Sequence, residues 1–144
     1  MSVAVKRVYD KAALADGKRV LVDRLWPRGV SKQRAALDAW LRDLAPSDDL
    51  REWFHATPGA WAMFRKKYLK ELARPEAVEE LTELYRLAHG RKRVTLLFAS
   101  RDVERNNAVV LKDLLDGMRK PPTGTGPAGA RTASVRQAKR MPRR

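Results

Sequence analysis

The feature that most constrains the fold is a near-continuous apolar run, VTLLFA at positions 94–99. A strand exposed on one face alternates apolar and polar side chains, whereas a strand covered on both faces is apolar along its length. A shorter run, Val20 to Val22, lies within the segment 19–25 and has the same character. Both runs are typical of parallel sheets, which helices cover on both sides. The chain is therefore predicted to be an α/β domain.

A further strand and a series of helices complete the predicted fold. The segment VAVKRVY at 3–9 alternates apolar and polar residues, and the pair Asp16-Gly17 indicates a turn before the segment 19–25. Between this segment and the apolar run at 94–99, the apolar residues follow helical spacing. We expect a small three-stranded, mainly parallel sheet packed by about four to five helices.

The predicted helix boundaries follow from apolar spacing and from capping residues. The first expected helix has an apolar face at Leu37, Trp40, Leu41 and Leu44, and a short second helix is capped by Ser47 or Asp49. The third is opened by Thr57 and Pro58 and buries Trp61, Phe64 and Tyr68. The fourth runs from Pro75 to a stop at Gly90, and the fifth is capped by Asp102.

The charge of the chain is concentrated at its C-terminal end. Eight of the 31 lysines and arginines, and none of the 17 acids, lie from Arg119 onward, so residues 1–118 carry only +6 of the net charge of +14. The segment 119–144 is also rich in Pro, Gly, Thr and Ala, and it has too few bulky apolar residues to offset the entropy of ordering. We therefore predict an α/β domain over 1–118 and a disordered basic tail over 119–144.

Two polar segments follow the apolar strands and form the candidate site. In open parallel sheets, ligands bind outside the carboxyl ends of the strands. If the strands at 19–25 and 94–99 are parallel neighbours, the segments 23–29 and 100–107 meet at that edge. The candidate ligand-binding residues in these two segments are Asp23, Arg24, Trp26, Arg28, Asp102, Asn106 and Asn107.

The residue types of this candidate site favour an anion. Arginine offers forked donors suited to phosphate or carboxylate, and the segment 100–107 leads into a predicted helix N-terminus, whose free backbone N–H groups favour an anion. Asn106 and Asn107 offer both donors and acceptors. Trp26 supplies a surface for stacking. Purely structural roles are the alternative: Asp23 pairing with a neighbouring arginine, Asp102 acting only as a cap, and Asn107 bonding a buried carbonyl.

Several other kinds of site are not expected. The chain has no cysteine, which excludes disulfides and thiol chemistry, and its two histidines, His55 and His89, lack partners at metal-ligand spacing. No P-loop motif occurs, and the one GxGxxG match, GTGPAG at 124–129, lies in the predicted disordered tail and not between a predicted strand and helix. No cofactor and no metal are therefore predicted. No run approaches the ~18 apolar residues that span a bilayer, and the N-terminus lacks the apolar stretch of a signal peptide. We expect a cytoplasmic protein with no membrane partner.

Four segments of the chain closely resemble the DUF488 family, in its YeaO-like branch. They are RVLVDRLWPRG at 19–29, LDAWLRDLAPSDDLREWF at 37–54, WAMFRKKYLKEL at 61–72 and VTLLFASRDVERNNAVVLKDLL at 94–115. The resemblance covers roughly residues 3–116 and implies a small bacterial α/β protein. A distant branch of the family has cysteines near the strand at 94–99 and Cys-His-Arg where this chain has Asn106-Asn107-Ala108. Thiol or metal chemistry of that branch does not carry over to this chain.

Three functions remain as hypotheses, the third being a purely structural adaptor role. In the first, the domain binds an anionic small molecule, a nucleotide or a phosphorylated metabolite, at the carboxyl ends of its strands, either as a binding domain or as an enzyme whose catalytic residues the sequence does not identify. In the second, the basic tail binds the phosphate backbone of nucleic acids without reading their sequence.

Overall fold

A computed structural model describes residues 1–122 of the chain. Its elements in chain order are β1 (Val3–Arg7), a 3-10 turn (Leu14–Asp16), β2 (Lys18–Leu21), α1 (Lys32–Ala35), β3 (Ala39–Trp40), a second 3-10 turn (Arg42–Leu44), α2 (Asp48–Ala56), α3 (Trp61–Glu71), α4 (Pro75–Ala88), β4 (Val94–Phe98) and α5 (Asn107–Gly117). The predicted α/β class is confirmed. The predicted tail at 119–144 lies mostly outside the described residues, since the description ends at residue 122.

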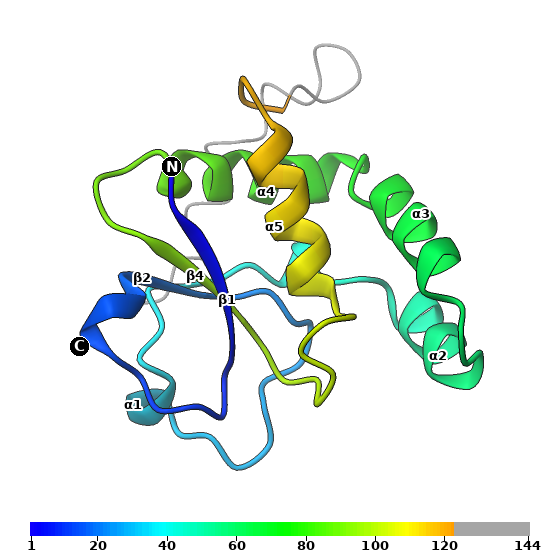
Figure 1. The fold of residues 1–144 in the computed structure, drawn as a ribbon, viewed down its shortest axis with the longest axis horizontal. Helices are drawn as coiled ribbons and strands as arrows, with labels where there is room; N and C mark the ends of the chain where they lie inside the picture. Colours follow the sequence, from blue (N-terminus) through cyan, green and yellow to red (C-terminus); the bar gives the residue numbers. More distant parts are fainter. Residues whose placement is uncertain (123–144) are drawn as a thin grey trace.

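The strands form one parallel sheet in the order β1-β4-β2-β3 (Figure 1). The two apolar runs that dominate the sequence are its central strands, and every residue of β4 is buried. β2 and β4 are direct neighbours, with Leu21 opposite Leu97. Their carboxyl ends therefore lie at the same edge of the sheet, as the candidate site requires.

The sheet separates two apolar clusters of unequal size. The larger cluster joins alternate residues of β2 and β4, such as Val20 and Leu96, to α3, α4 and α5. The smaller one contains Leu21 and Leu97, which point to the opposite face, with Trp26 and Trp40 packed at its edge. α2 and α3 lie side by side at one end of the sheet and extend beyond it (Figure 1). One flank of the carboxyl edge is thus bounded by α2.

The fourth strand, β3, corrects the predicted helix at 37–44. In the structure the Asp38 backbone N–H donates to Arg19 O at 2.8 Å, and that of Leu41 donates to Leu21 O at 2.9 Å. These bonds extend the sheet beyond β2. The apolar spacing of the segment matched a helix face, but pairing with the open edge of β2 satisfies its backbone groups instead.

Two predicted helix starts are also wrong. Thr57 ends α2 rather than capping α3, because its hydroxyl donates to Trp53 O at 2.7 Å. A turn through Gly59, with a φ of 80°, then places the first residue of α3 at Trp61. Asp102 does not cap α5, whose N-cap is Asn106. The expected starts at Ser47 for α2 and at Pro75 for α4 are confirmed.

Candidate functional site

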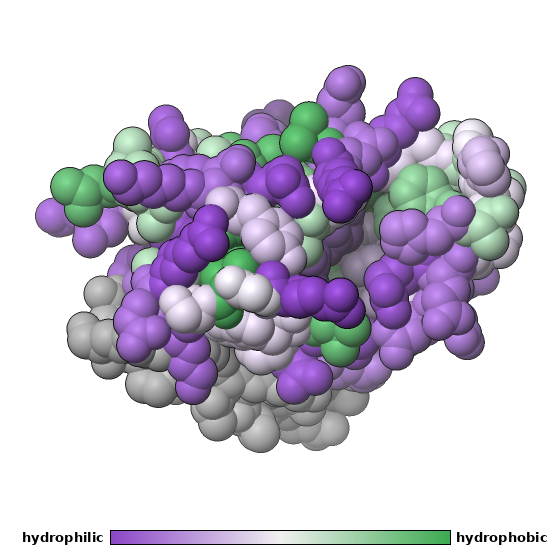
Figure 2. Space-filling view, turned by 90° about the horizontal axis from the view of Figure 1, so that it is seen from below, coloured by the Kyte–Doolittle hydropathy of each residue, from purple (hydrophilic) through white to green (hydrophobic). Residues whose placement is uncertain are grey.

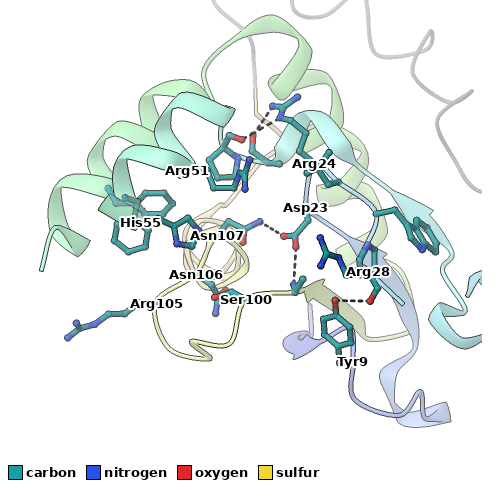
Figure 3. A pocket seen from close by; sticks show the side chains of 18 residues that line it. Tyr9, Asp23, Arg24, Arg28, Arg51, His55, Ser100, Arg105, Asn106 and Asn107 are labelled. Atoms are coloured by element: carbon teal, nitrogen blue, oxygen red, sulfur yellow. Dashed lines mark hydrogen bonds between the residues drawn. The ribbon is translucent and has the colours of Figure 1, made fainter. Parts of the chain in front are cut away.

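A pocket of about 350 Å³ opens at the carboxyl ends of β2 and β4. Its walls come from the segment 23–28 after β2, the segment 99–107 after β4, and α2 (Figure 3). Hydrophilic side chains predominate on the side of the molecule that carries these loops, with paler surface between them (Figure 2). The two segments singled out from the sequence thus meet around one cavity. Of the seven candidate residues, all except Asp102 line it.

Asp23 lies at the junction of three elements. Its Oδ2 accepts a hydrogen bond from the Ala99 backbone N–H at 2.9 Å, and its Oδ1 accepts one from the Asn107 side-chain amide at 3.1 Å. Its backbone carbonyl accepts a third, from the Trp40 indole N–H at 2.8 Å. Asp23 therefore links the ends of β2 and β4 to the start of α5, as Figure 3 shows for the two carboxylate bonds.

The pKa of Asp23 is raised above its ordinary value because burial disfavours the charged carboxylate. The hydrogen bonds from Ala99 and Asn107, together with the positive charge of Arg51, oppose this effect without cancelling it. No ion pair joins Asp23 to Arg24 or Arg28 in the described part of the chain. The structure thus does not support the alternative in which Asp23 ties down a neighbouring arginine.

The two predicted arginines differ in how they are held. The Arg24 guanidinium donates to the carbonyls of Ala45 and Pro46 at 3.3 and 3.5 Å, which ties the loop after β2 to the start of α2. Arg28 is exposed, and its guanidinium forms no hydrogen bond or ion pair within residues 1–122. Its backbone carbonyl accepts a hydrogen bond from the Tyr9 hydroxyl at 3.0 Å, which fixes the turn that carries it. Arg28 is therefore the arginine whose donors remain available to a ligand.

Trp26 makes mainly structural contacts. Its indole N–H donates to Val30 O at 2.6 Å, and its ring packs edge-on against Trp40 with centroids 5.4 Å apart. These contacts close the turn 26–30, in which Gly29 adopts a φ of 79°. Trp26 still lines the pocket, where it adds apolar surface.

The start of α5 supplies the remaining predicted residues. Asn106 caps the helix by accepting from the Val109 N–H at 3.0 Å, and its amide donates to Asp102 O at 2.8 Å. Asn107 is buried, and its side-chain amide donates to Val22 O at 2.9 Å as well as to Asp23. The purely structural role predicted as an alternative for Asn107, a hydrogen bond to a buried carbonyl, is therefore present in the structure. Asp102 is exposed and accepts from the backbone N–H groups of Glu104 and Arg105. It holds the loop before α5 and does not reach the pocket.

The sequence interpretation missed the contribution of α2. Arg51 and His55 are one helical turn apart, and both line the pocket together with Phe54. Among residues 1–122, the Arg51 guanidinium is held only by an exposed pair with Asp48 at 3.4 Å. The sequence did show that Arg51 and His55 are four residues apart and therefore share a helix face next to Phe54. It did not show that this face of α2 is directed at the end of the sheet. Arg105 also lines the pocket, and Figure 3 shows it directed away from the other labelled side chains.

The lining residues give the pocket a positive balance and no assembled nucleophile. Four arginines and one aspartate are the charged residues of the lining. His55 forms no hydrogen bond within residues 1–122, so it is not paired with Ser100 or with Asp23. No cluster of three metal-ligating side chains occurs in the same part of the chain. The lining groups within residues 1–122 can hold an anion by hydrogen bonds and charge.

Comparison with known proteins identifies the family. The model of a family described as the "inactive DUF488-N3 subclade" matches residues 2–128. The chain belongs to the DUF488 family. It is 45% identical over 117 residues to "Uncharacterized protein YeaO" of Escherichia coli K12, an alignment that covers 80% of this chain and 97% of that protein.

A mycobacterial relative shows a similar level of identity. "Uncharacterized protein Rv3073c" of Mycobacterium tuberculosis H37Rv is 44% identical over 115 residues, covering 80% of this DUF488 chain and 94% of the relative. No solved structure is significantly similar to the chain. No helix within residues 1–122 is long and apolar enough to cross a membrane.

Proposed function

We propose that the pocket binds a phosphate-bearing small molecule and does not transform it. The observation that carries this proposal is the Arg28 guanidinium, which lines the pocket without a partner among residues 1–122. Arginine presents donors in a planar fork that matches two phosphate oxygens. Arg51, across the pocket on α2, supplies a second cation with only an exposed partner.

The charge balance supports a multiply charged anion. With four arginines against one aspartate, the lining carries a surplus of three positive charges, which a phosphate at neutral pH offsets better than a single carboxylate. The first backbone N–H groups of α5 lie at the same edge and favour an anion there. A pocket of about 350 Å³ is at the lower end of the range of small-molecule sites.

Binding without chemistry is favoured by two independent points. The matching family model is described as an inactive subclade, and the described lining contains no hydrogen-bonded pair of nucleophile and base. Acyl-transfer and hydrolytic enzymes with a serine or threonine nucleophile commonly activate it through such a pair. The proposal is therefore a ligand-binding domain.

A thermal-shift screen of the full chain tests this function. Nucleoside monophosphates and sugar phosphates are compared with their unphosphorylated forms. At a ligand concentration about 100 times Kd, specific binding stabilises the native state by about 2.7 kcal/mol and raises Tm by several degrees. We expect this shift for phosphorylated compounds only. Equal shifts for both forms, or none, would contradict the proposal.

Arg28→Lys separates ligand binding from stability, and Arg91→Lys is its control. Lysine retains the charge of Arg28 but not the fork, so we expect roughly tenfold weaker binding with Tm of the free protein unchanged. Arg91 is exposed and lies in the loop before β4, at the opposite end of that strand. The two variants should therefore differ in binding and agree in stability. If they bind equally, Arg28 does not touch the ligand.

A second candidate function concerns the basic segment 119–144. Its eight lysines and arginines and absence of acids favour binding to the phosphate backbone of nucleic acids, independently of the pocket. Most of this segment lies outside the described residues. We propose nucleic-acid binding as an accessory activity of the segment.

A further inference from the structure

The inner wall of the pocket presents hydrogen-bond acceptors, in contrast to the cations at its mouth. The Asn107 amide nitrogen donates to Val22 O and to Asp23 Oδ1, and these two bonds fix which way the amide faces. Its Oδ1 then accepts no hydrogen bond from any residue in the described part of the chain. Because Asn107 lines the pocket and this oxygen is not among the buried unpaired atoms of residues 1–122, it is reachable from the cavity. An acceptor that the protein leaves without a donor is open to a donor on a ligand.

The Asp23 carboxylate lies directly beside this acceptor. Each of its oxygens accepts one hydrogen bond, from Ala99 N–H or from the Asn107 amide, and a carboxylate oxygen has capacity for a second. Asp23 and Asn107 therefore form a pair of adjacent acceptors at the junction of β2, β4 and α5 (Figure 3). The complement of this pair is a ligand edge with two neighbouring N–H donors.

We propose that the ligand is a guanine nucleotide, with the N1–H and N2–H donors of the base on the Asp23–Asn107 pair and the phosphate on Arg28 and Arg51. This inference rests on the proposed function and adds the identity of the group at the other end of the ligand. A carboxylate and an amide oxygen are the acceptors that match a donor–donor edge. Phe54 and His55 line the α2 side of the pocket and supply planar side chains for the base.

Other bases match the acceptor pair less well. Adenine presents an acceptor, N1, next to its amino group, so its N1 would face the Asp23 carboxylate without a proton between them. Hypoxanthine retains the N1–H donor and lacks the 2-amino group. Guanine alone among these three purines places two donors side by side. A base that lacks one or both donors leaves an acceptor of the pocket wall unpaired, and such unpaired groups discriminate strongly between ligands.

Calorimetric titration of the full-length protein with three nucleotides tests the inference without any mutation. We expect guanosine monophosphate to bind about tenfold or more tightly than adenosine monophosphate, the scale of one bidentate base interaction. Inosine monophosphate should fall between them. Guanosine without its phosphate should bind more weakly than its monophosphate, because it cannot engage Arg28 and Arg51.

Two variants assign the preference to residues. Asp23→Asn preserves the shape of the side chain but replaces one acceptor by a donor. The variant should therefore bind guanosine and adenosine monophosphate with about equal affinity. Asp102→Asn is the matched control, because Asp102 is exposed and outside the pocket, and it should keep the preference. Tm of each variant is measured alongside, so that a loss of folding is not mistaken for a loss of selectivity.

The outcomes distinguish the two levels of the proposal. Equal affinity for the three nucleotides, all phosphate-dependent, overturns the guanine assignment and leaves the phosphate-binding function in place. The same holds if wild type prefers the adenine nucleotide. If neither the nucleotides nor inorganic phosphate binds the full chain, both the guanine assignment and the proposed function are wrong.

Discussion

Two aspartates show how the same side chain acquires opposite properties within one small domain. Burial raises the pKa of Asp16, but hydrogen bonds from the Ala13 backbone, Lys6 and Arg19 outweigh it and leave the pKa below its ordinary value. For Asp23, burial dominates over the bonds from Ala99 and Asn107, and its pKa is raised. Asp16 is thus held as a structural anion. The fold compensates the burial of the Asp23 carboxylate only partly.

The first prediction concerns the pH dependence that follows from Asp23. Because its pKa is raised on folding, its contribution to stability is fully present below the unfolded-state value of 3.8 and is lost as pH rises through the folded-state value. Asp23→Asn removes this contribution. From pH 3.5 to pH 7, the free energy of unfolding of wild type should therefore fall relative to that of the variant. Urea unfolding of both proteins measures the difference, and a relative rise for wild type would show that the sign is wrong.

At the scale of single elements, strands with a pattern of their own were predictable from sequence, including β1 at one edge of the sheet, whereas the short edge strand β3 was not. β4 and β2 are buried on both faces, so their apolar runs identified them directly. β3 has only two residues, and its pairing depends on the open edge of β2 rather than on any pattern of its own. The start of α5 was misplaced because Asp102 and Asn106 are both good capping residues. Only the structure shows that Asp102 caps a turn.

The second prediction tests which face of α3 is buried. Phe64 is 2% exposed and stacks on Phe54 with ring centroids 4.3 Å apart, whereas the neighbouring Met63 is 50% exposed. Phe64→Ala should cost about 3–5 kcal/mol, because it leaves a cavity in the main core. Met63→Ala should stay within about 0.5 kcal/mol of wild type. Chemical denaturation measures both, and similar costs for the two variants would mean that the burial of α3 is wrong.

The third prediction tests the N-cap of α5. Asn106→Ala removes the bond to the Val109 N–H and should cost about 1 kcal/mol. Asp102→Ala removes only bonds within an exposed turn, so its cost should be smaller. Thermal and urea unfolding of the two variants give the comparison. A larger cost for Asp102→Ala would restore Asp102 as the cap.

At the scale of the whole molecule, the location of the candidate site followed from topology. The segments 23–28 and 99–107 leave adjacent parallel strands, so their convergence was predictable once β2 and β4 were taken as neighbours. The third wall of the pocket is α2, with Arg51 and His55. Its position depends on the tertiary packing of a helix that α1, β3 and a 3-10 turn separate from β2. Local sequence does not encode such packing, which explains why those two residues were missed.

The fourth prediction concerns the basic segment. α5 ends at Gly117, and Met118 is its C-cap and packs against the core. Deleting 119–144 should therefore leave Tm nearly unchanged. Binding to duplex DNA should weaken, and the slope of log K against log salt should flatten by about 0.9 for each phosphate that the segment neutralised. A truncated protein that retains the full slope would place the nucleic-acid surface on the domain itself.

The most direct test of the proposal that the pocket binds phosphate is an NMR titration of the isotope-labelled full chain with guanosine monophosphate. We expect saturable shifts of the Ala99 backbone amide and the Asn107 side-chain amide, which flank Asp23, and of the guanidinium signals of Arg28 and Arg51. Inorganic phosphate should move the arginine signals and leave the Asn107 amide in place. Shifts confined to residues outside the pocket, or no saturable shift at all, would contradict binding at this site.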